Sequence, residues 1–394
     1  MAGTLNVGQL IPDVGTNLYL NAQQYGGNVI IGNTTTTLIK FDGSGTITAN
    51  VITSNTVNAT TVTSNVVATT VSTSNMTLGG NAIGAGDASI MKNRIINGAF
   101  TVSQYNGTSS VTPTDLSYPI DRFRARLSQT GKYSVQQNAG SVTPPVGFSN
   151  YLGVTSLSAY AVTSTDYFSI QQVIEGFNTY DLGFGTANAK TVTLSAWVYS
   201  SLTGTFGGNL VNNASSRCYP FTYTISSANT WTQISITIAG DTTGTWTGAS
   251  NAGSLVVTFA LGAGSTQSGT AGAWSGTFTM SATGATSVVG TNGATFYITG
   301  VQLEVGSSAT GFEYRQYGQE LALCQRYYYQ IPSWYVPAGA NAFVGTFHRV
   351  SMRATPTLGG GGAGFSTGFN NSEAFFPFQT TGAYLTALTV SAEL

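Results

Sequence analysis

The sequence has few charged side chains, only two cysteines and a single histidine in 394 residues. Charged residues make up 7% of the chain, against about 25% in an average soluble protein. The formal net charge is -1, so the chain lacks the excess of lysine and arginine that binds nucleic acid or an anionic membrane. Direct nucleic-acid binding is therefore not expected, and solubility must come from Thr, Ser, Asn, Gln and backbone amides.

Long hydrophobic runs are also missing. No apolar run approaches the roughly 18 residues that a membrane-spanning helix needs, so membrane insertion is not expected. The first residues, up to Val14, lack a basic segment followed by an apolar one, which predicts a protein made in the cytosol without a cleaved export signal. The two cysteines, Cys218 and Cys324, are too few for a disulfide framework; they can pair, but small buried free thiols are the expected state.

Helical periodicity is scarce, whereas glycine is abundant, with 49 residues. From about residue 87 to residue 306, apolar residues alternate with polar ones at a period of two, which is typical of strands with one buried face. The alternating sets are Val192, Leu194, Ala196 and Val198; Tyr219, Phe221, Tyr223 and Ile225; Ile234, Ile236 and Ile238; and Leu255, Val257, Phe259 and Leu261. These patterns predict an all-β fold.

One strand changes phase. Phe296 and Ile298 occupy even positions, whereas Val301, Leu303 and Val305 occupy odd ones, and Gly300 stands at the change. A glycine at such a switch predicts a β-bulge. Short strands separated by turn signals indicate a two-sheet sandwich, and we expect a jelly roll.

A single plausible helix covers residues 319–328. Leu321, Cys324 and Tyr328 fall at i, i+3 and i+7, which places them on one face. This helix would connect the sandwich to a last stretch of about 60 residues, which alternates aromatic strands with glycine turns. Such a stretch is marginal as an independent domain, so we expect it to fold against the sandwich or against neighbouring subunits.

The stretch from Ile47 to Met76 repeats itself. The tripeptide Thr-Ser-Asn recurs every ten residues, and an apolar residue recurs every five, at Ile47, Ile52, Val57, Val62 and Val67. A period of five matches neither a lone amphipathic helix nor a flat half-buried strand. The intervening Thr, Ser and Asn residues disfavour a helix, so the repeat predicts short strands and turns.

One such thread buries too little apolar surface to offset roughly 1 to 2 kcal/mol of backbone entropy per residue. Several identical chains wound together would bury the repeated side chains along a common axis and pair their strand edges. The repeat therefore predicts a homo-oligomeric shaft, and we expect a trimer. The alternatives are a disordered linker and a single-chain solenoid, although so few coils would leave both solenoid ends uncapped.

Several segments together resemble bacteriophage tail fibre and other virion structural proteins. The segments that carry the resemblance are residues 27–32, 92–100, 174–177, 202–205, 240–246, 291–330, 351–357 and 391–394. The resemblance implies a trimeric, non-enzymatic virion appendage with a jelly roll similar to a carbohydrate-binding module, exposed on the particle and recognising host-surface polysaccharide. Capsid decoration or a head fibre without a receptor role is the first alternative, and a glycan depolymerase is the second.

The domain organisation follows from these patterns and from the composition shift near Gly86. Residues 1–45 are expected to form a β-stranded stem that attaches to other virion proteins, although another shaft coil explains them equally well. Residues 46–86 form the shaft and a glycine hinge, residues 87–318 the jelly-roll sandwich, and residues 319–394 the linker helix and the C-terminal β-domain.

Sugar binding normally uses exposed aromatic faces beside polar groups. Trp197 and Tyr199 point away from the presumed core of their strand, and Trp246 and Trp274 lie in Gly/Thr/Ser loops, which makes these four the candidate glycan-binding residues. The competing interpretation is that these rings pack under loops or at a subunit interface. For the tyrosines at residues 327–329 we favour a subunit interface.

Catalytic and metal signatures are weak. The residues at 364–368 fit G-x-S-x-G, but no helical pattern follows, and a dinucleotide fingerprint at 359–364 lacks a βαβ unit, so no cofactor is expected. One histidine, His348, and two distant cysteines cannot assemble a zinc site. The densest charge cluster, residues 121–126, is explained by a solvated or intersubunit salt-bridge strand.

Two further possibilities involve the acidic residues. Calcium held by backbone carbonyls and carboxylates has no signature here, although Asp121, Glu175 and Glu304 are candidate ligands. Glycan hydrolysis needs two carboxylates about 5 to 10 Å apart, and the sequence brings no two of Glu175, Asp181, Glu304 and Glu313 together.

The shaft hypothesis makes a direct prediction about assembly. Size-exclusion chromatography with light scattering of the full chain should give the mass of a trimer, because one copy of the repeat cannot bury its apolar residues alone. A monomer at micromolar concentration would contradict the shaft.

Overall fold

The computed structural model describes residues 76–78, 81–83, 92–336, 346–360, 366–378 and 383–394. The predicted stem at residues 1–45 and the five repeated shaft positions, Ile47, Ile52, Val57, Val62 and Val67, lie outside these residues. Every described residue belongs to one compact unit, Val71–Leu394. It begins with a short antiparallel pair, β1 (Met76–Leu78) and β2 (Asn81–Ile83). No described helix is long and apolar enough to span a membrane.

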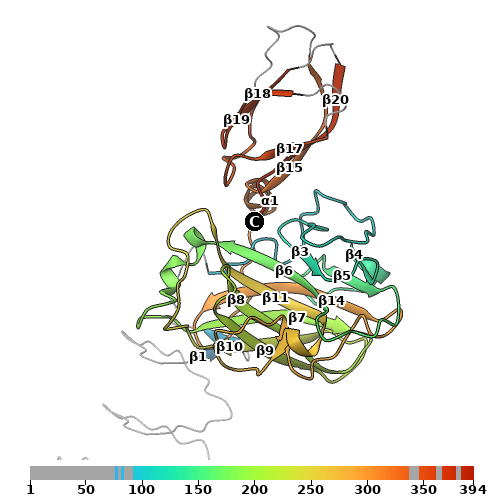
Figure 1. The fold of residues 1–394 in the computed structure, drawn as a ribbon, viewed down its shortest axis with the longest axis vertical. Coiled ribbons are helices and arrows are strands. Elements are labelled where there is room, and N and C mark those ends of the chain that lie inside the picture. The colour runs from blue at the N-terminus through green and yellow to red at the C-terminus, as the bar shows by residue number, and fades with distance from the viewer. Residues whose placement is uncertain (1–75, 79–80, 84–91, 337–345, 361–365, 379–382) are drawn as a thin grey trace, which may run out of the picture. The chain divides into compact units, whose positions relative to one another are not determined.

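Two five-stranded antiparallel sheets are the largest sheets of the described chain (Figure 1). We call sheet I the one with the order β10 (Thr232–Ile238), β7 (Val192–Ser200), β14 (Thr295–Val305), β5 (Leu152–Ser156) and β4 (Tyr133–Gln137). Sheet II has the order β3 (Arg124–Leu127), β6 (Tyr167–Glu175), β11 (Gly253–Ala263), β8 (Gly204–Asn212) and β9 (Cys218–Ile225). The fold is the expected all-β sandwich of jelly-roll type.

The core lies between the two sheets and consists of the alternating residues predicted from the sequence. Every member of the four alternating sets is buried in this core, apart from Ile236, which packs against it partly exposed. Each fully buried large apolar side chain contributes about 1.5 to 3 kcal/mol, so these residues determine which face of each strand points inward. In β14, the predicted inward-facing residues are also buried, except Val305 at the end of the strand, whose side chain is 37% exposed.

The predicted bulge is present in β14. The pairing of β14 with β7 shifts register between Thr299 and Gln302, and Gly300 between them has φ +61°. The Phe148 ring lies so close that a Cβ on Gly300 would meet its Cζ atom at 2.6 Å. Only glycine combines this backbone conformation with such a close ring, which explains why the phase change occurs at this residue.

Smaller elements complete the fold. The short helices are η1 (Ala139–Ser141), η2 (Gly176–Asn178), η3 (Tyr180–Leu182) and η4 (Ser265–Gln267), and a short parallel pair joins β12 (Ser268–Gly269) to β13 (Ser281–Ala282). The C-terminal β-domain has two three-stranded sheets. One has the order β15 (Tyr328–Val336), β20 (Ala383–Ser391), β17 (Thr357–Gly359), and the other β16 (Thr346–Phe347), β19 (Ala374–Phe378), β18 (Ser366–Asn370).

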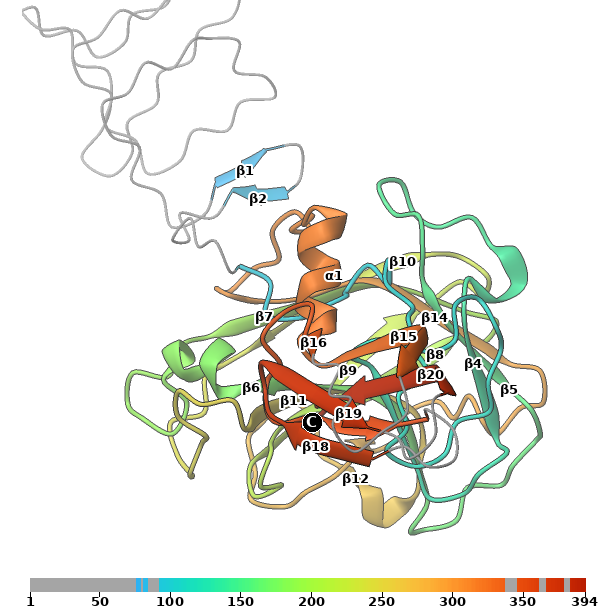
Figure 2. The same ribbon diagram turned by 90° about the horizontal axis from the view of Figure 1, so that it is seen from above.

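The predicted linker helix exists but is shifted. Helix α1 runs over Tyr317–Gln325 and leads directly into β15 (Figure 2). Cys324 is buried and Leu321 packs beside it, as expected, whereas Tyr328 is the first residue of β15 and does not share the helix face. Tyr328 adopts the strand conformation because it pairs with Ser391 of β20. Local helical periodicity does not reveal this contact.

The charge cluster at residues 121–126 is solvated only in part, because its Arg126–Asp115 ion pair is partly exposed whereas Asp121 and Arg122 are buried within the chain. Arg122 is 1% exposed and forms an ion pair with Glu393, whose side chain is 7% exposed. The Arg122 guanidinium also donates to the Val173 carbonyl at 2.7 Å and stacks 3.4 Å from the Tyr327 ring centroid. Burial raises the pKa of Glu393, and the neighbouring Arg122 opposes that rise.

The residues around Glu393 anchor the C-terminal β-domain to the sandwich. Leu394 packs against apolar residues of sheet II and of helix α1, and its backbone oxygen accepts hydrogen bonds from Tyr118 and Arg124. The Arg353 guanidinium donates to the Ala392 carbonyl at 2.7 Å. The last stretch therefore folds against the sandwich of its own chain, one of the two outcomes expected from its small size.

The tyrosines at residues 327–329 are buried inside the chain, so a subunit interface is the wrong interpretation for them. Tyr327 lies under Arg122, Tyr328 stacks on Tyr105 with 3.5 Å between ring centroids, and the Tyr329 hydroxyl is hydrogen-bonded to Nδ1 of His348. They serve the contact between sandwich and C-terminal β-domain. Both cysteines are free and buried, as expected.

We predict that Arg122→Gln lowers the free energy of unfolding by about 3 to 5 kcal/mol, because it leaves the Glu393 carboxylate buried without its partner. The matched control is Arg126→Gln, four residues away, whose ion pair with Asp115 is exposed and should be worth less than about 1 kcal/mol. Urea denaturation followed by tryptophan fluorescence measures both. Equal losses in the two variants would contradict the anchoring role of Arg122.

We predict that Gly300→Ala destabilises the sandwich more than Gly293→Ala does. Both glycines have positive φ, which costs a Cβ-bearing residue about 1 to 2 kcal/mol, but a Cβ on Gly293 would meet no atom within 4 Å. At Gly300 the contact with Phe148 should add about 1 to 3 kcal/mol of overpacking. Thermal unfolding of both variants compares them, and an equal loss would show that the Phe148 ring moves away freely.

Candidate functional site

A groove of about 260 Å³ lies on the outer face of sheet I, away from the core. It is lined by Val146, Phe148, Ser195, Ala196, Trp197, Gln233, Gly300, Thr310, Gly311, Phe312 and Tyr314. Strands β7, β10 and β14 provide its floor, and two loops outside the sheet provide its walls. The groove contains one of the four predicted glycan-binding residues, Trp197.

Trp197 reaches the groove because of the alternation along β7. Its neighbours Ala196 and Val198 are buried in the core, so the intervening side chain must point outward. Across the sheet, Trp197 pairs with Gln233 of β10 and with Thr299 of β14. Directly paired residues carry their side chains on the same face, which places the Gln233 amide beside the indole ring.

Three further rings form the wall of the groove. Phe148, Phe312 and Tyr314 pack on one another, with ring centroids 5.1 Å apart for Phe148 and Phe312 and 5.0 Å apart for Phe312 and Tyr314. Tyr314 remains 59% exposed. The bulge at Gly300 leaves space for the Phe148 ring over β14, so the wall depends directly on the phase change in that strand.

A buried acidic residue holds the loop that carries Phe312. The Glu304 carboxylate accepts hydrogen bonds from the Thr310 backbone N–H at 2.8 Å and from the Thr310 hydroxyl at 2.6 Å. Gln302 donates to the same carboxylate at 2.9 Å and accepts the Glu313 backbone N–H at 2.9 Å. These bonds fix residues 310–313 over the sheet, so the wall is formed before any ligand arrives.

None of the described residues that line the groove is charged. Aromatic rings stand beside one carboxamide and the hydroxyls of Ser195 and Thr310, with Val146 exposed at the rim. Such a surface can stack on an apolar ring face and exchange hydrogen bonds with hydroxyl groups. It offers no countercharge to an ionic ligand.

Tyr199 belongs to a different cluster on the same face of sheet I. Its ring stacks on Tyr297 with 5.2 Å between centroids and an angle of 6°, and it contacts Trp231 at 5.4 Å. Tyr151 completes the cluster, and its hydroxyl donates to the Ala139 carbonyl. Burial raises the pKa of Tyr151 and Tyr297. One face of Tyr199 is therefore covered by packing.

Trp246 and Trp274 lie in two different loops, and their rings contact each other. Their ring centroids are 5.6 Å apart at 88°, and both contact Phe184 at the edge of the core. The Trp274 indole donates to the Ala239 carbonyl at 2.7 Å, and the Trp246 indole donates to Asp241 at 3.3 Å. The structure brings these two rings to each other, but neither lines the groove.

Asp241, beside Trp246, shows how the loops are held. Burial by itself would raise the pKa of this carboxyl, but two hydrogen bonds from Arg217, at 2.7 and 2.8 Å, hold the pKa below its usual value. The ion pair fixes the loop under which Trp246 packs. Most contacts of Trp246 are therefore those of a ring packed under a loop, which is the competing interpretation of this residue.

The acidic residues considered from the sequence are held by other side chains or by backbone donors. Glu175 pairs with Arg326 at 3.1 Å and Asp181 with Arg94 at 2.7 Å, and Asp121 accepts from the Gln104 side chain at 2.6 Å. Glu304 binds Thr310, as described above. Within the described ranges, no group of three His, Cys, Asp or Glu side chains is placed to hold a metal ion.

The serine motif does not form a nucleophile elbow. Ser366 is the first residue of strand β18, whereas an elbow leads from a strand into a helix. His348 engages both ring nitrogens elsewhere, since Nδ1 lies 2.6 Å from the Tyr329 hydroxyl and Nε2 lies 2.9 Å from the Asn371 carbonyl oxygen. Burial lowers the pKa of His348.

Sequence reasoning missed most of the groove. Gln233 alternates with core residues on β10 and was identifiable as outward-facing once β10 was placed beside β7. Phe312 and Tyr314 alternate in a short run, which is a usable signal for one shared face. Phe148 gives no such signal, because it lies in a loop whose position depends on the bulge at Gly300.

No protein-family model matches this chain, and no curated protein matches it. Among solved structures, the chain is similar to the enzymatically active domain of tailspike protein 4 of Bacteriophage CBA120, at 12% identity and a TM-score of 0.31. The alignment covers 54% of this chain and 21% of the tailspike chain, so it spans about a fifth of that structure.

Two carbohydrate-binding modules are similar over nearly their full length. A family 11 module from Clostridium thermocellum, in complex with a β-1,3-1,4-mixed-linked tetrasaccharide, aligns with 51% of this chain and 98% of its own, at 11% identity and a TM-score of 0.27. TmCBM61, in complex with β-1,4-galactotriose, aligns with 55% of this chain and 99% of its own, at 11% identity and a TM-score of 0.28. Similarity at this level assigns neither a ligand nor an activity to the chain.

Proposed function

We propose that this chain is a trimeric virion appendage of a bacteriophage, a tail fibre or a related fibre or spike, whose jelly roll binds neutral glycans on the host surface. The observation that carries the glycan-binding part is the groove on sheet I, where Trp197 and Gln233 lie side by side under a wall of three aromatic rings. The virion role follows from the sequence resemblance and from the pentad repeat.

The chemistry of the groove favours a sugar over other small ligands. A pyranose has an apolar face that stacks on an aromatic ring, and a rim of hydroxyls that exchange hydrogen bonds with amides and hydroxyls. Trp197 would supply the ring, and Gln233 and Ser195 the polar partners. Because the described residues that line the groove are all uncharged, a neutral sugar fits better than an acidic one.

Binding without hydrolysis is the activity proposed here. Glu304 contacts the groove through Thr310, one of its lining residues. Both oxygens of the Glu304 carboxylate accept hydrogen bonds from Thr310. Glu313 accepts the Asn93 backbone N–H at 2.7 Å and pairs with Arg315 at 3.1 Å. Carboxylates held in this way are positioned for structure, whereas a glycosidase needs a pair directed at the scissile bond.

Multivalency is the proposed mechanism of attachment. One shallow groove gives a weak contact, and three copies held on one shaft raise the overall avidity without any new contact. The partners are therefore two further copies of this chain, other virion proteins through residues 1–45, and the host polysaccharide. The proposed location is the surface of the phage particle. Capsid decoration or a head fibre without a receptor role is the alternative for a chain whose groove binds no glycan.

We predict that Trp197→Ala weakens glycan binding about 10- to 100-fold, or about 1.4 to 2.8 kcal/mol, because it removes the stacking face. Binding of the full chain to immobilised host envelope polysaccharide measures the change. Tyr180→Ala is the matched control, since Tyr180 is 58% exposed and does not line the groove. Equal binding by wild type and Trp197→Ala would place any receptor contact elsewhere.

The same polysaccharide distinguishes binding from cleavage. Incubation with the wild-type chain should release no reducing ends. Release that stops in a Glu175→Gln or Glu304→Gln variant would replace the proposal with the depolymerase alternative.

A further inference from the structure

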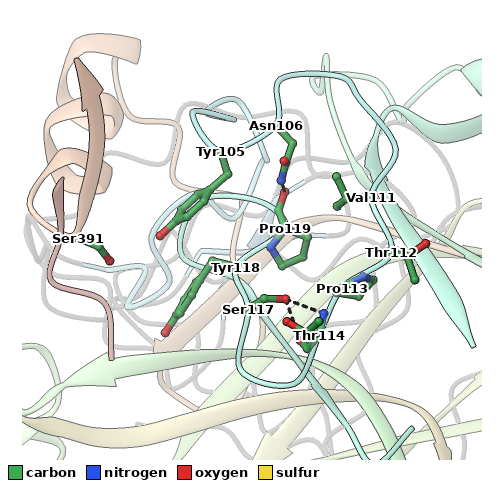
Figure 3. Close-up of a pocket in the computed structure, with 10 residues that line it drawn as sticks. All are labelled: Tyr105, Asn106, Val111, Thr112, Pro113, Thr114, Ser117, Tyr118, Pro119 and Ser391. Atoms are coloured by element: carbon green, nitrogen blue, oxygen red, sulfur yellow. Dashed lines mark hydrogen bonds between the residues drawn. The ribbon is translucent and has the colours of Figure 1, made fainter. Parts of the chain in front are cut away.

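A second pocket, of about 470 Å³, lies where the sandwich meets the C-terminal β-domain (Figure 3). Nine of its lining residues come from the loop at residues 105–119, and Ser391, from the end of β20, lies on the opposite side. The lining residues are Tyr105, Asn106, Val111, Thr112, Pro113, Thr114, Ser117, Tyr118, Pro119 and Ser391. The volume falls in the range of about 300 to 1,000 Å³ typical of small-molecule sites.

The lining combines flat apolar surfaces with neutral polar groups. Two tyrosine rings and two prolines provide the apolar part, and the hydroxyls of Thr112, Thr114 and Ser391 provide donors and acceptors. Among the described residues that line the pocket, none is charged. The charged groups beside the two tyrosines are engaged within the protein: Glu393 pairs with Arg122, Asp121 accepts from Gln104, and Arg124 donates to the Leu394 backbone oxygen.

The two tyrosine rings are fixed before any ligand arrives. They lie nearly parallel, with centroids 6.1 Å apart and an angle of 17°. The Tyr118 hydroxyl donates to the Leu394 backbone oxygen, and Tyr105 stacks on Tyr328 of β15. Burial raises the pKa of Tyr118 to about 12, so its hydroxyl stays protonated and keeps donating at neutral pH.

The rest of the pocket is equally constrained. The Ser117 hydroxyl donates to the Thr114 carbonyl at 2.7 Å and accepts the Thr114 N–H at 3.0 Å, which closes the turn shown by dashed lines in Figure 3. The Asn106 amide donates to the Pro119 carbonyl at 2.8 Å. A ligand therefore loses little affinity to ordering of the protein.

We propose that this pocket is a second saccharide site, which takes a neutral mono- or disaccharide unit between the sandwich and the C-terminal β-domain. The Tyr118 ring, which Tyr105 and Tyr328 support from one side, would stack on the sugar, and Thr112 and Ser391 would bind its hydroxyls from opposite sides. Because Ser391 belongs to the C-terminal β-domain, the site is complete only when the Arg122–Glu393 anchor holds that domain in place. The inference rests on the proposed function for the class of ligand and uses a different set of residues.

The test is saturation-transfer NMR on the full chain with a panel of neutral sugars: glucose, galactose, mannose, N-acetylglucosamine and their disaccharides. Thr112→Arg places a long side chain in the pocket from an exposed position, and Ser391→Arg does so from the opposite side. Each should weaken binding of at least one panel sugar about tenfold or more. Ser110→Arg, an exposed position on the same loop that does not line the pocket, should leave that binding unchanged.

Trp197→Ala separates this site from the groove on sheet I. Sugar binding that persists in Trp197→Ala and is lost when Thr112→Arg is added supports the second site. If no panel sugar responds to Thr112→Arg or Ser391→Arg, the second site is overturned, whatever Trp197→Ala does. Binding lost in Trp197→Ala alone would then leave the proposed function standing without the second site.

Discussion

The buried ion pair between Arg122 and Glu393 is the interaction on which the arrangement of the two β-domains depends. Two charges taken out of water are costly unless they are paired and hydrogen-bonded. Here the guanidinium meets the carboxylate, the Val173 carbonyl and the face of Tyr327 at once. With Leu394 packed beside it, this pair joins sheet II and helix α1 to the end of β20, and it makes the pocket beside Ser391 possible.

The groove on sheet I depends on a different constraint, the bulge at Gly300. Without the bulge, β14 would keep one alternation throughout, and Val301 and Leu303 would leave the core. The extra residue corrects the phase and leaves space for Phe148. Glu304 and Gln302, beyond the bulge, then fix the loop that carries Phe312. One local irregularity therefore serves both the core and the wall of the groove.

The aromatic residues of this chain have two distinct uses. Trp246 and Trp274 pack on Phe184, and their indole N–H groups donate hydrogen bonds within the chain. These contacts stabilise their loops in a chain that has few charged residues. Among the described residues, none accepts a hydrogen bond from the Trp197 indole, and this ring lines an open groove. Tryptophan in a loop and tryptophan on a strand face thus differ in what they contact, although their local sequences look equally suited to sugar binding.

Much of the fold could be predicted from local patterns. Strands with one buried face alternate with a period of two, so β7, β9, β10 and β11 were recognisable from single segments, and the phase change marked the bulge in β14. These features depend on side chains a few residues apart along one strand. The free state of Cys218 and Cys324 followed from composition in the same way.

What the sequence alone determined was therefore the class of fold, the inward face of each strand and the position of the bulge, because each of these depends on neighbours along the chain. The tertiary structure decided which distant residues meet. It paired Arg122 with Glu393, took Tyr328 out of the helix, placed Gln233 beside Trp197 and separated Trp197 from Trp246. Such contacts depend on strand order and domain packing, which local periodicity does not encode.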